Sequence, residues 1–294
     1  MEFRVLQYFL AVTKEGSISA AANSLHLSQP TLSRQLKELE CELGKQLFIR
    51  SNRKITLTEE GMILRKRAEE ITELVKKTQI DISSSDKTLS GDIYIGSGET
   101  VGVKQIAKVA KELRNKYPLL HFHIISGDKT SVLEELDRGL IDFALVFGDI
   151  DFSKYDSLML PSVDQFCVMM RKDDILANKE IVNTEDLIDK PLIVSRQILH
   201  DSNLKEIFGY DINELNIVAT YNLLYNGSLM VSEGIGYAIC FDNIVNVTGD
   251  SNLCLRPLSI KITPKMNLIW KKYQIFTKPA GIFIEAMKRN LKSL

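Results

Sequence analysis

The first 43 residues contain three short stretches in which apolar side chains recur every three or four positions. That spacing places the apolar residues on one face of a helix, so it predicts helices over residues 3–15, 20–25 and 29–43. Gly16 and Gly44 follow the first and third stretches, where a glycine commonly ends a helix. Three short helices within one small domain therefore open the chain.

Two β-prone runs follow, at residues 47–49 and 55–57, and the polar residues 51–54 separate them. This pattern predicts a two-stranded hairpin, a wing beside the helices. Thr58 then caps a long helix whose apolar residues step by four and three positions. Such a stripe is stable when a second helix covers it, so we expect the chain to dimerise through it. The expected dimerisation residues are Leu64, Ala68, Ile71, Val75, Thr78 and Ile82.

From residue 92 onward, short apolar strands alternate with helical stretches, a pattern typical of an α/β fold with a parallel sheet. Strands are expected at 93–95, 122–125, 143–146, 166–170, 192–194, 217–219, 237–240 and 266–270. Helices are expected at 100–117, 130–139, 202–208, 222–233 and 280–294. The pattern restarts near residue 166, which predicts two α/β lobes, and we expect the last strand and helix to return to the first lobe.

The polar run at residues 83–87 and the pair Ser90-Gly91 indicate a hinge between the long helix and the lobes. The expected parts of the chain are a domain at 1–58, a linker helix and hinge at 59–90, a first lobe from 91–162 and 264–294, and a second lobe at 163–263.

The N-terminal part resembles the winged helix-turn-helix of LysR-type transcriptional regulators over roughly the first 60 residues. The resemblance rests on Phe9-Leu10-Ala11-Val12, Gly16-Ser17, Ala20-Ala21, Leu25 through Gln35, Leu39-Glu40, Leu43-Gly44, Leu47-Phe48, Arg50, Arg53, Leu57-Thr58 and Gly61. It implies a dimerising linker helix followed by a two-lobed α/β effector domain resembling periplasmic binding proteins. Gly139 and the run Gly234-Ile235-Gly236 stand where that family has recurring glycines. The expected fold class is thus α/β with an all-α N-terminal part.

The third helix turns its leucines inward and its polar side chains outward, and an α-helix fits the major groove of DNA. Arg34 can pair with guanine and Gln29 with adenine, while hydroxyl side chains suit phosphates. The wing adds positive charge, and we expect Arg53 to enter the flanking minor groove. The expected DNA-binding residues are Ser28, Gln29, Pro30, Thr31, Ser33, Arg34, Lys37, Arg50, Arg53 and Lys54.

Ligands of open α/β sheets bind beyond the carboxyl ends of the strands, so we expect an effector in the crevice between the lobes. The expected effector-binding residues are Ser97, Thr100, Thr130, Phe147, Ser195, Arg196 and Cys240. Each of them can alternatively be a capping or surface group. Arg196 beside two helix N-termini favours a small anionic metabolite.

Three other patterns match parts of cofactor-binding, metal-binding or catalytic motifs, but each of them is incomplete. Residues 96–102 resemble a dinucleotide-binding turn, but the third glycine comes one residue late and the acidic residue is missing. His121 and His123 share a strand face without an evident third metal ligand, and residues 126–129 match a serine acyl-enzyme pattern without its companion motifs. We therefore expect no catalytic residue, no metal and no cofactor.

Composition narrows the class of protein. Hydrophobic residues make up 45% and the net charge is -1, which fits globular domains and excludes a wholly basic nucleic-acid-coating protein. Four cysteines without a CxxC pair indicate reduced thiols, and the spacing of Cys240 and Cys254 differs from that of the family's thiol-switch members. The N-terminus lacks a signal peptide's apolar run and no stretch reaches the ~18 apolar residues of a membrane span, so we expect a cytoplasmic protein without a membrane partner.

The leading hypothesis is a DNA-binding transcriptional regulator, and no enzyme, that senses a small-molecule effector. Its expected partners are double-stranded promoter DNA, the effector, a second copy of itself in a homodimer or homotetramer, and RNA polymerase. The alternatives are a two-lobed solute-binding protein, which residues 1–58 contradict, and an enzyme, for which the four histidines offer no persuasive arrangement. The effector, the operator and the sign of regulation stay open.

Overall fold

The computed structural model describes residues 1–50, 55–83, 89–161, 164–200, 205, 209, 212–260 and 265–292. The chain forms two compact units, Met1–Ser84 and Ser85–Leu294. Each unit has its own apolar core.

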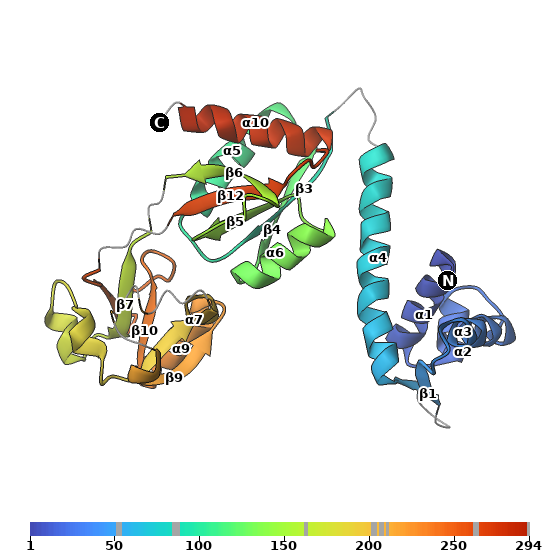
Figure 1. The fold of residues 1–294 in the computed structure, drawn as a ribbon, viewed down its shortest axis with the longest axis horizontal. Helices are drawn as coiled ribbons and strands as arrows, with labels where there is room; N and C mark the ends of the chain where they lie inside the picture. Colours follow the sequence, from blue (N-terminus) through green and yellow to red (C-terminus); the bar gives the residue numbers. More distant parts are fainter. Residues whose placement is uncertain are drawn as a thin grey trace. The chain divides into compact units, whose positions relative to one another are not determined.

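The first unit is a winged helix-turn-helix (Figure 1). Its elements are α1 (Phe3–Glu15), α2 (Ile18–Ser24), α3 (Gln29–Leu43), β1 (Phe48–Arg50), β2 (Ile55–Leu57) and α4 (Glu59–Ser83). Phe9, Leu32 and Leu36 are fully buried between the helices, and β1 pairs antiparallel with β2. The three helices and the wing expected from the sequence are confirmed, whereas Leu43, expected on the inner face of α3, is 40% exposed.

The start of α4 is built into this unit. Thr58 Oγ1 accepts a hydrogen bond from the Gly61 amide at 3.0 Å and donates one to the Gln46 carbonyl at 2.7 Å. A Cβ atom on Gly61 would lie 2.2 Å from the Leu47 carbonyl oxygen, so only glycine fits at this close approach. The first turns of α4 therefore belong to the first unit rather than to a free linker.

The first lobe of the second unit is a five-stranded sheet in the order β4-β3-β5-β12-β6. Its strands are β3 (Gly91–Ser97), β4 (Leu120–Ser126), β5 (Phe143–Phe147), β6 (Tyr155–Leu160) and β12 (Met266–Lys271). Helices α5 (Val103–Lys116) and α10 (Lys278–Lys292) pack together on one face, and α6 (Lys129–Arg138) packs on the other (Figure 1). The last strand and helix do return to this lobe, as expected.

The second lobe is a five-stranded sheet in the order β11-β7-β10-β8-β9. Its strands are β7 (Phe166–Arg171), β8 (Leu192–Ser195), β9 (Ile217–Tyr221), β10 (Tyr237–Phe241) and β11 (Leu253–Pro257). Within the residues described for this lobe, the α-helices are α7 (Arg196–His200) and α9 (Leu224–Ser232), and short 3-10 helices span Ile175–Asn178, Thr184–Leu187 and Ile212–Glu214. Phe166, Val168 and Ile239 lie in one of the apolar clusters that cover this sheet.

Both sheets are mixed, which corrects the expectation of parallel sheets. In the first lobe β12 runs antiparallel to β5 and β6, and in the second lobe β7 runs antiparallel to β10 and β11. The sequence pattern did not predict the edge strands β6 and β11. The helix expected at 202–208 lies outside the described residues except for Lys205, and so do the expected lobe boundaries near 162 and 264, which stay predictions. Among the helices of the described ranges, none combines the length and the apolar character needed to cross a membrane.

Candidate DNA-binding and effector sites

The N-terminus of α3 is fixed by Ser28, whose Oγ accepts a hydrogen bond from the Thr31 amide at 3.3 Å and shares one with Thr31 Oγ1 at 2.7 Å. Leu32, Leu36 and Leu39 are buried, so the opposite face of the helix points to solvent. Ser28, Gln29, Pro30, Thr31, Arg34 and Lys37 are exposed and Ser33 is half-buried. The structure thus gathers all seven α3 candidates on or beside one outward face.

Arg34 extends from the middle of that face, with 72% of its side chain exposed. Its Nε lies 3.6 Å from Glu38 Oε1, one helical turn further on. An exposed pair of this kind contributes about 0–1 kcal/mol and is screened by salt. A guanine or a phosphate can therefore replace Glu38 as the partner of Arg34 at little cost.

Glu40 holds the wing against α3. In the sequence alone, Glu40 had no role beyond its part in the family resemblance. Glu40 Oε1 accepts hydrogen bonds from the amides of Leu47 at 2.8 Å and Phe48 at 3.3 Å. On the other wing strand, the Ile55 amide donates to the Gly16 carbonyl at 3.1 Å. The backbone of Arg50 ends β1, while its side chain and the whole of Arg53 and Lys54 lie outside the described part of the chain.

The expected dimerisation stripe of α4 is covered near the start of the helix and exposed further along it. Ala68 is fully buried in the core of its own unit and Leu64 packs against the same core, so Ala68 cannot meet a partner helix. Val75 is half-buried, and Ile71, Thr78 and Ile82 are exposed. Leu64 and Ile82 are 18 residues apart, which is five turns of 3.6 residues, so the expected stripe stays on one side of α4 and only its N-terminal end is covered by the first unit.

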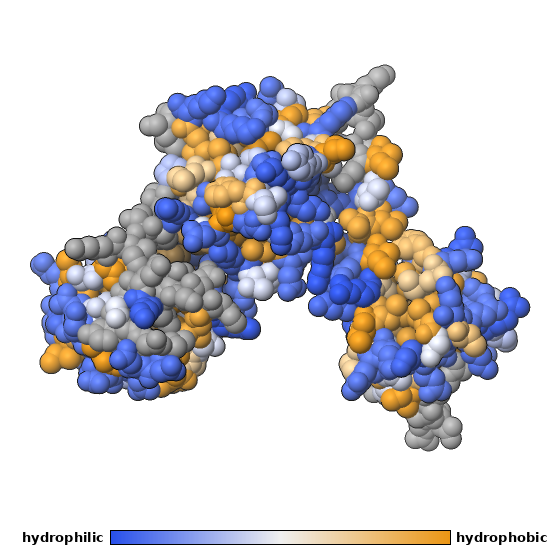
Figure 2. Space-filling model, viewed as in Figure 1, coloured by the Kyte–Doolittle hydropathy of each residue, from blue (hydrophilic) through white to orange (hydrophobic). Residues whose placement is uncertain are grey.

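The exposed apolar residues of α4 include two that the sequence pattern did not single out. Ile63 is 65% exposed and Leu74 42% exposed, and at 100° per residue they lie roughly a quarter turn around the helix from Ile71 and Ile82. Apolar surface along α4 is visible in Figure 2. We call Ile63, Ile71, Leu74 and Ile82 the outer stripe of α4.

Thr100, just before α5, donates a hydrogen bond to the two carboxylate oxygens of Asp164 at 2.9 and 2.8 Å, and the Val101 amide donates a third at 3.1 Å. The anion position expected here is thus filled by the chain's own carboxylate, from the start of the second lobe. Burial raises the pKa of Asp164, the Thr100 hydrogen bond opposes that rise, and the nearby charge of Asp242 adds to it.

Two further contacts join the same parts of the lobes. Glu99 Oε2 accepts a hydrogen bond from the Leu224 amide at the start of α9. The ring of Phe147, at the end of β5, lies 4.9 Å from the ring of Phe241, at the end of β10. Thr100 and Phe147 are therefore the two effector candidates found at the junction between the lobes.

Two other effector candidates are buried. Ser97 is buried and its hydroxyl donates to the Gly98 carbonyl at 2.7 Å. Cys240 is buried in an apolar cluster with Cys167, Met169 and Ile193. These two side chains are not exposed in this structure, and their assignment to the effector site stays a prediction.

Three candidates remain accessible to some degree. Ser195 Oγ accepts a hydrogen bond from the Ile198 amide at 3.2 Å and so begins α7, and Arg196 next to it is exposed. Thr130 is exposed on α6, where it lines an open cavity of the first lobe together with Lys129 and Lys154.

The histidine pair also has a defined place. Nε2 of His123 lies 2.9 Å and Nδ1 of His121 lies 3.7 Å from Asp92 Oδ1, and the Tyr94 ring stacks on His123 at 4.5 Å. Within the ranges that the structure describes, no group of three or more His, Cys, Asp or Glu side chains is arranged to hold a metal ion.

Residues 3–62 match the family described as "Bacterial regulatory helix-turn-helix protein, lysR family", and residues 86–292 match "LysR substrate binding domain". The chain belongs to the LysR family. It is a LysR-type DNA-binding transcriptional regulator with an effector-binding domain, and this family consists of transcription regulators rather than enzymes.

Relatives of the LysR-family chain include the HTH-type transcriptional regulator BsdA of Bacillus subtilis, 32% identical over 74% of this chain and 73% of BsdA. The dual regulator OxyR of Escherichia coli is 32% identical over 66% of this chain and 63% of its own length. The crystal structure of CbnR, a LysR family transcriptional regulator, shares the fold with a TM-score of 0.76 at 19% identity, over 98% of this chain and 99% of CbnR.

Proposed function

We propose that this regulator reads its operator through the outward face of α3, with Arg34 and Gln29 contacting base edges and Ser28, Thr31, Ser33 and Lys37 contacting phosphates. The observation that carries the proposal is the exposed polar face of α3 above a buried row of leucines. Pro30 lies in the first turn of α3, and Arg50, Arg53 and Lys54 of the wing reach the flanking DNA. CbnR, whose fold the chain shares, has been solved in complex with its target DNA.

The functional unit is a homodimer or a homotetramer formed through the outer stripe of α4, extended by Thr78 and Val75. The exposed Ile63, Leu74 and Ile82 support this assignment, because an apolar stripe on a long helix gains stability when another helix covers it. Two copies also place two α3 helices on DNA, so an operator with two half-sites is expected.

The regulatory signal is a small, anionic effector bound between the lobes. Thr100, Phe147, Ser195, Arg196 and Thr130 are the residues proposed to contact it. Two observations support an anion: Thr100 and Val101 already hold a carboxylate, and the guanidinium of Arg196 is exposed at the start of α7. The ligand shifts the lobes only if it binds one lobe arrangement better than another. The regulator acts in the cytoplasm, contacts RNA polymerase at its promoter, and catalyses no reaction.

Mobility shifts with the full-length protein and the intergenic DNA beside its own gene test this function, together with light scattering. We expect a retarded complex whose affinity falls steeply with salt concentration, and a dimer or a tetramer in solution. Equal affinity for intergenic and random DNA would defeat the regulatory role. A monomer in solution would defeat the assignment of α4.

A further inference from the structure

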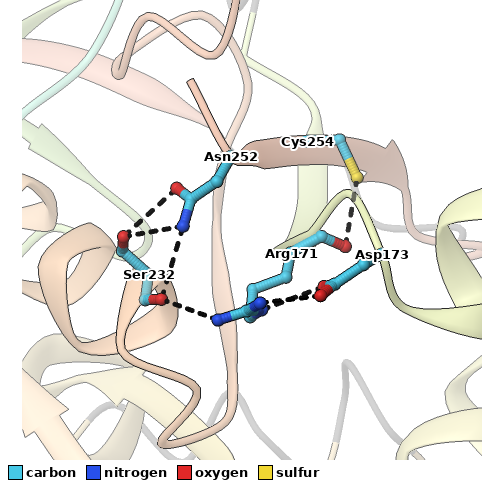
Figure 3. A network of polar contacts seen from close by, with 5 residues as sticks. All are labelled: Arg171, Asp173, Ser232, Asn252 and Cys254. Carbon is cyan, nitrogen blue, oxygen red and sulfur yellow. Dashed lines mark hydrogen bonds and ion pairs between the residues drawn. The ribbon is translucent and has the colours of Figure 1, made fainter. Parts of the chain in front are cut away.

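Helix α9 is anchored at its C-terminal end within the second lobe (Figure 3). The Ser232 carbonyl there accepts hydrogen bonds from Arg171 at 3.3 Å and from Asn252 at 3.4 Å. Arg171 is in turn held by two hydrogen bonds to the Asp173 carboxylate, at 2.9 and 2.6 Å. Cations and amide donors at this end match the negative pole of the helix, so α9 is fixed to β7 and β11 as one body.

The N-terminal end of α9 depends on the other lobe. Leu223 precedes the helix and offers no capping side chain, and no acidic residue lies in the first turn. The first amide, that of Leu224, donates instead to the carboxylate of Glu99, which comes from the turn between β3 and α5. The cap of α9 is thus supplied from 125 residues away along the chain.

Glu99 sits next to the second link between the lobes. The following residues, Thr100 and Val101, donate their hydrogen bonds to Asp164. One short turn of the first lobe is therefore hydrogen-bonded to the second lobe at two places. Glu99 accepts a hydrogen bond at one of them, and Thr100 and Val101 donate hydrogen bonds at the other.

We propose that Glu99 is a clasp between the lobes: its carboxylate caps α9, holds the effector-free arrangement, and is the group that an anionic effector displaces. A helix N-terminus with free amides attracts a carboxylate from either source. An effector anion that binds there takes the place of Glu99, and the turn that carries Glu99, Thr100 and Val101 then loses one of its two attachments to the second lobe. Because α9 is fixed at its other end, its own lobe keeps the helix in place while the first lobe moves.

The displacement of Glu99 by an effector rests on the proposed function. The contact between Glu99 and α9 does not, and it can be tested without DNA or an effector. Hydrogen exchange of the Leu224 amide, followed by mass spectrometry on full-length protein, reports the contact directly. Glu99→Ala removes it, and Glu99→Gln keeps an acceptor oxygen without the charge. Glu180→Ala, an exposed glutamate of the second lobe, is the matched control.

In Glu99→Ala we expect Leu224 to exchange about tenfold faster, because one hydrogen bond to a charged group changes an opening equilibrium by about that factor. Glu99→Gln should lie between the two, and Glu180→Ala should match the unmodified protein. Sodium acetate, compared with sodium chloride at equal ionic strength, should restore protection in Glu99→Ala and leave the unmodified protein unchanged, because a free carboxylate then fills the empty cap.

Unchanged exchange of Leu224 in Glu99→Ala would overturn the clasp. A variant that exchanges faster but is not protected by acetate would overturn the idea that an external anion can take the place of Glu99. If mobility shifts show no specific DNA binding while the exchange and rescue results hold, the proposed function fails and the clasp stands.

Discussion

Cys167 and Cys240 lie directly opposite each other on the antiparallel strands β7 and β10, and both are buried. Burial raises the pKa of Cys167 to about 12, and burial also raises the pKa of Cys240 well above its usual value. The thiolate is the reactive form of a cysteine. Both thiols therefore stay protonated at neutral pH, which argues against a thiol switch at Cys240.

The first prediction follows for chemical labelling. In the native protein, iodoacetamide should modify Cys41, which is exposed on α3, and spare Cys167, Cys240 and Cys254. In denaturant all four should react, and peptide mass spectrometry after timed labelling distinguishes the two patterns. Labelling of Cys240 in native protein as fast as that of Cys41 would contradict the burial.

The second prediction concerns base reading by α3. Arg34→Ala should weaken operator binding by about 1–3 kcal/mol and relax the preference at one base pair, because a bidentate contact to guanine is lost. The fold should be unaffected, since the pair with Glu38 is exposed and weak. Lys37→Ala is the comparison: it should weaken binding to operator and random DNA alike. Operator affinity equal to that of the unmodified protein would exclude Arg34 from the base-reading set.

The third prediction separates the covered and the exposed apolar residues of α4. Leu74→Asp should weaken the dimer and leave the first unit folded, because a charge is placed on the outer stripe. Ala68→Leu should instead lower the free energy of unfolding by about 1–3 kcal/mol without preventing dimerisation, because a larger side chain does not fit the packed core. Light scattering and urea denaturation measure the two effects. The assignment fails if the two variants exchange behaviours.

The fourth prediction is a pH dependence. The pKa of Asp164 is raised in the folded chain from its usual 3.8, so the stabilising contribution of its protonated form is full below 3.8 and is lost as pH rises through the raised value. Asp164→Asn, which cannot ionise, should therefore gain stability relative to the unmodified protein as pH increases from 4 toward neutral. Urea midpoints across that range measure it, with Asp156→Asn on the exposed part of β6 as control. A difference that shrinks with rising pH would refute the argument.

Local patterns predicted the elements of the first unit, because α1, α2 and α3 are each defined by neighbours within one or two turns. The same patterns did not show that the stripe of α4 is divided along its length, since a step of four and three residues fits the core-packed Leu64 and Ala68 as well as the exposed Ile71 and Ile82. Only the packing of Ala68 against the core of the first unit shows which part of the stripe is covered, and no periodicity within α4 contains that information.

The junction between the lobes was the least predictable part. Strand ends correctly suggested Thr100 as a polar group facing the other lobe, but its partner Asp164 is 64 residues away and the partner of Glu99 is a backbone amide. Every residue except proline has a backbone amide N–H, so nothing in the sequence marks the one that Glu99 contacts. The edge strands β6 and β11 were missed for a related reason: each is half exposed, so its residues lack the continuous apolar run of the buried strands.

The contact of Gly61 with the Leu47 carbonyl has a consequence for the shape of the operator. The wing and the first turns of α4 move as one rigid body. The DNA-reading surface is therefore rigidly connected to α4, a helix of 25 residues that is roughly 37 Å long. In a dimer, the angle and position at which two such helices cross set the distance between the two α3 helices that contact DNA. The number of base pairs separating the half-sites is then dictated by backbone geometry, and inserting half a helical turn of DNA would leave one α3 helix facing the wrong side of the duplex.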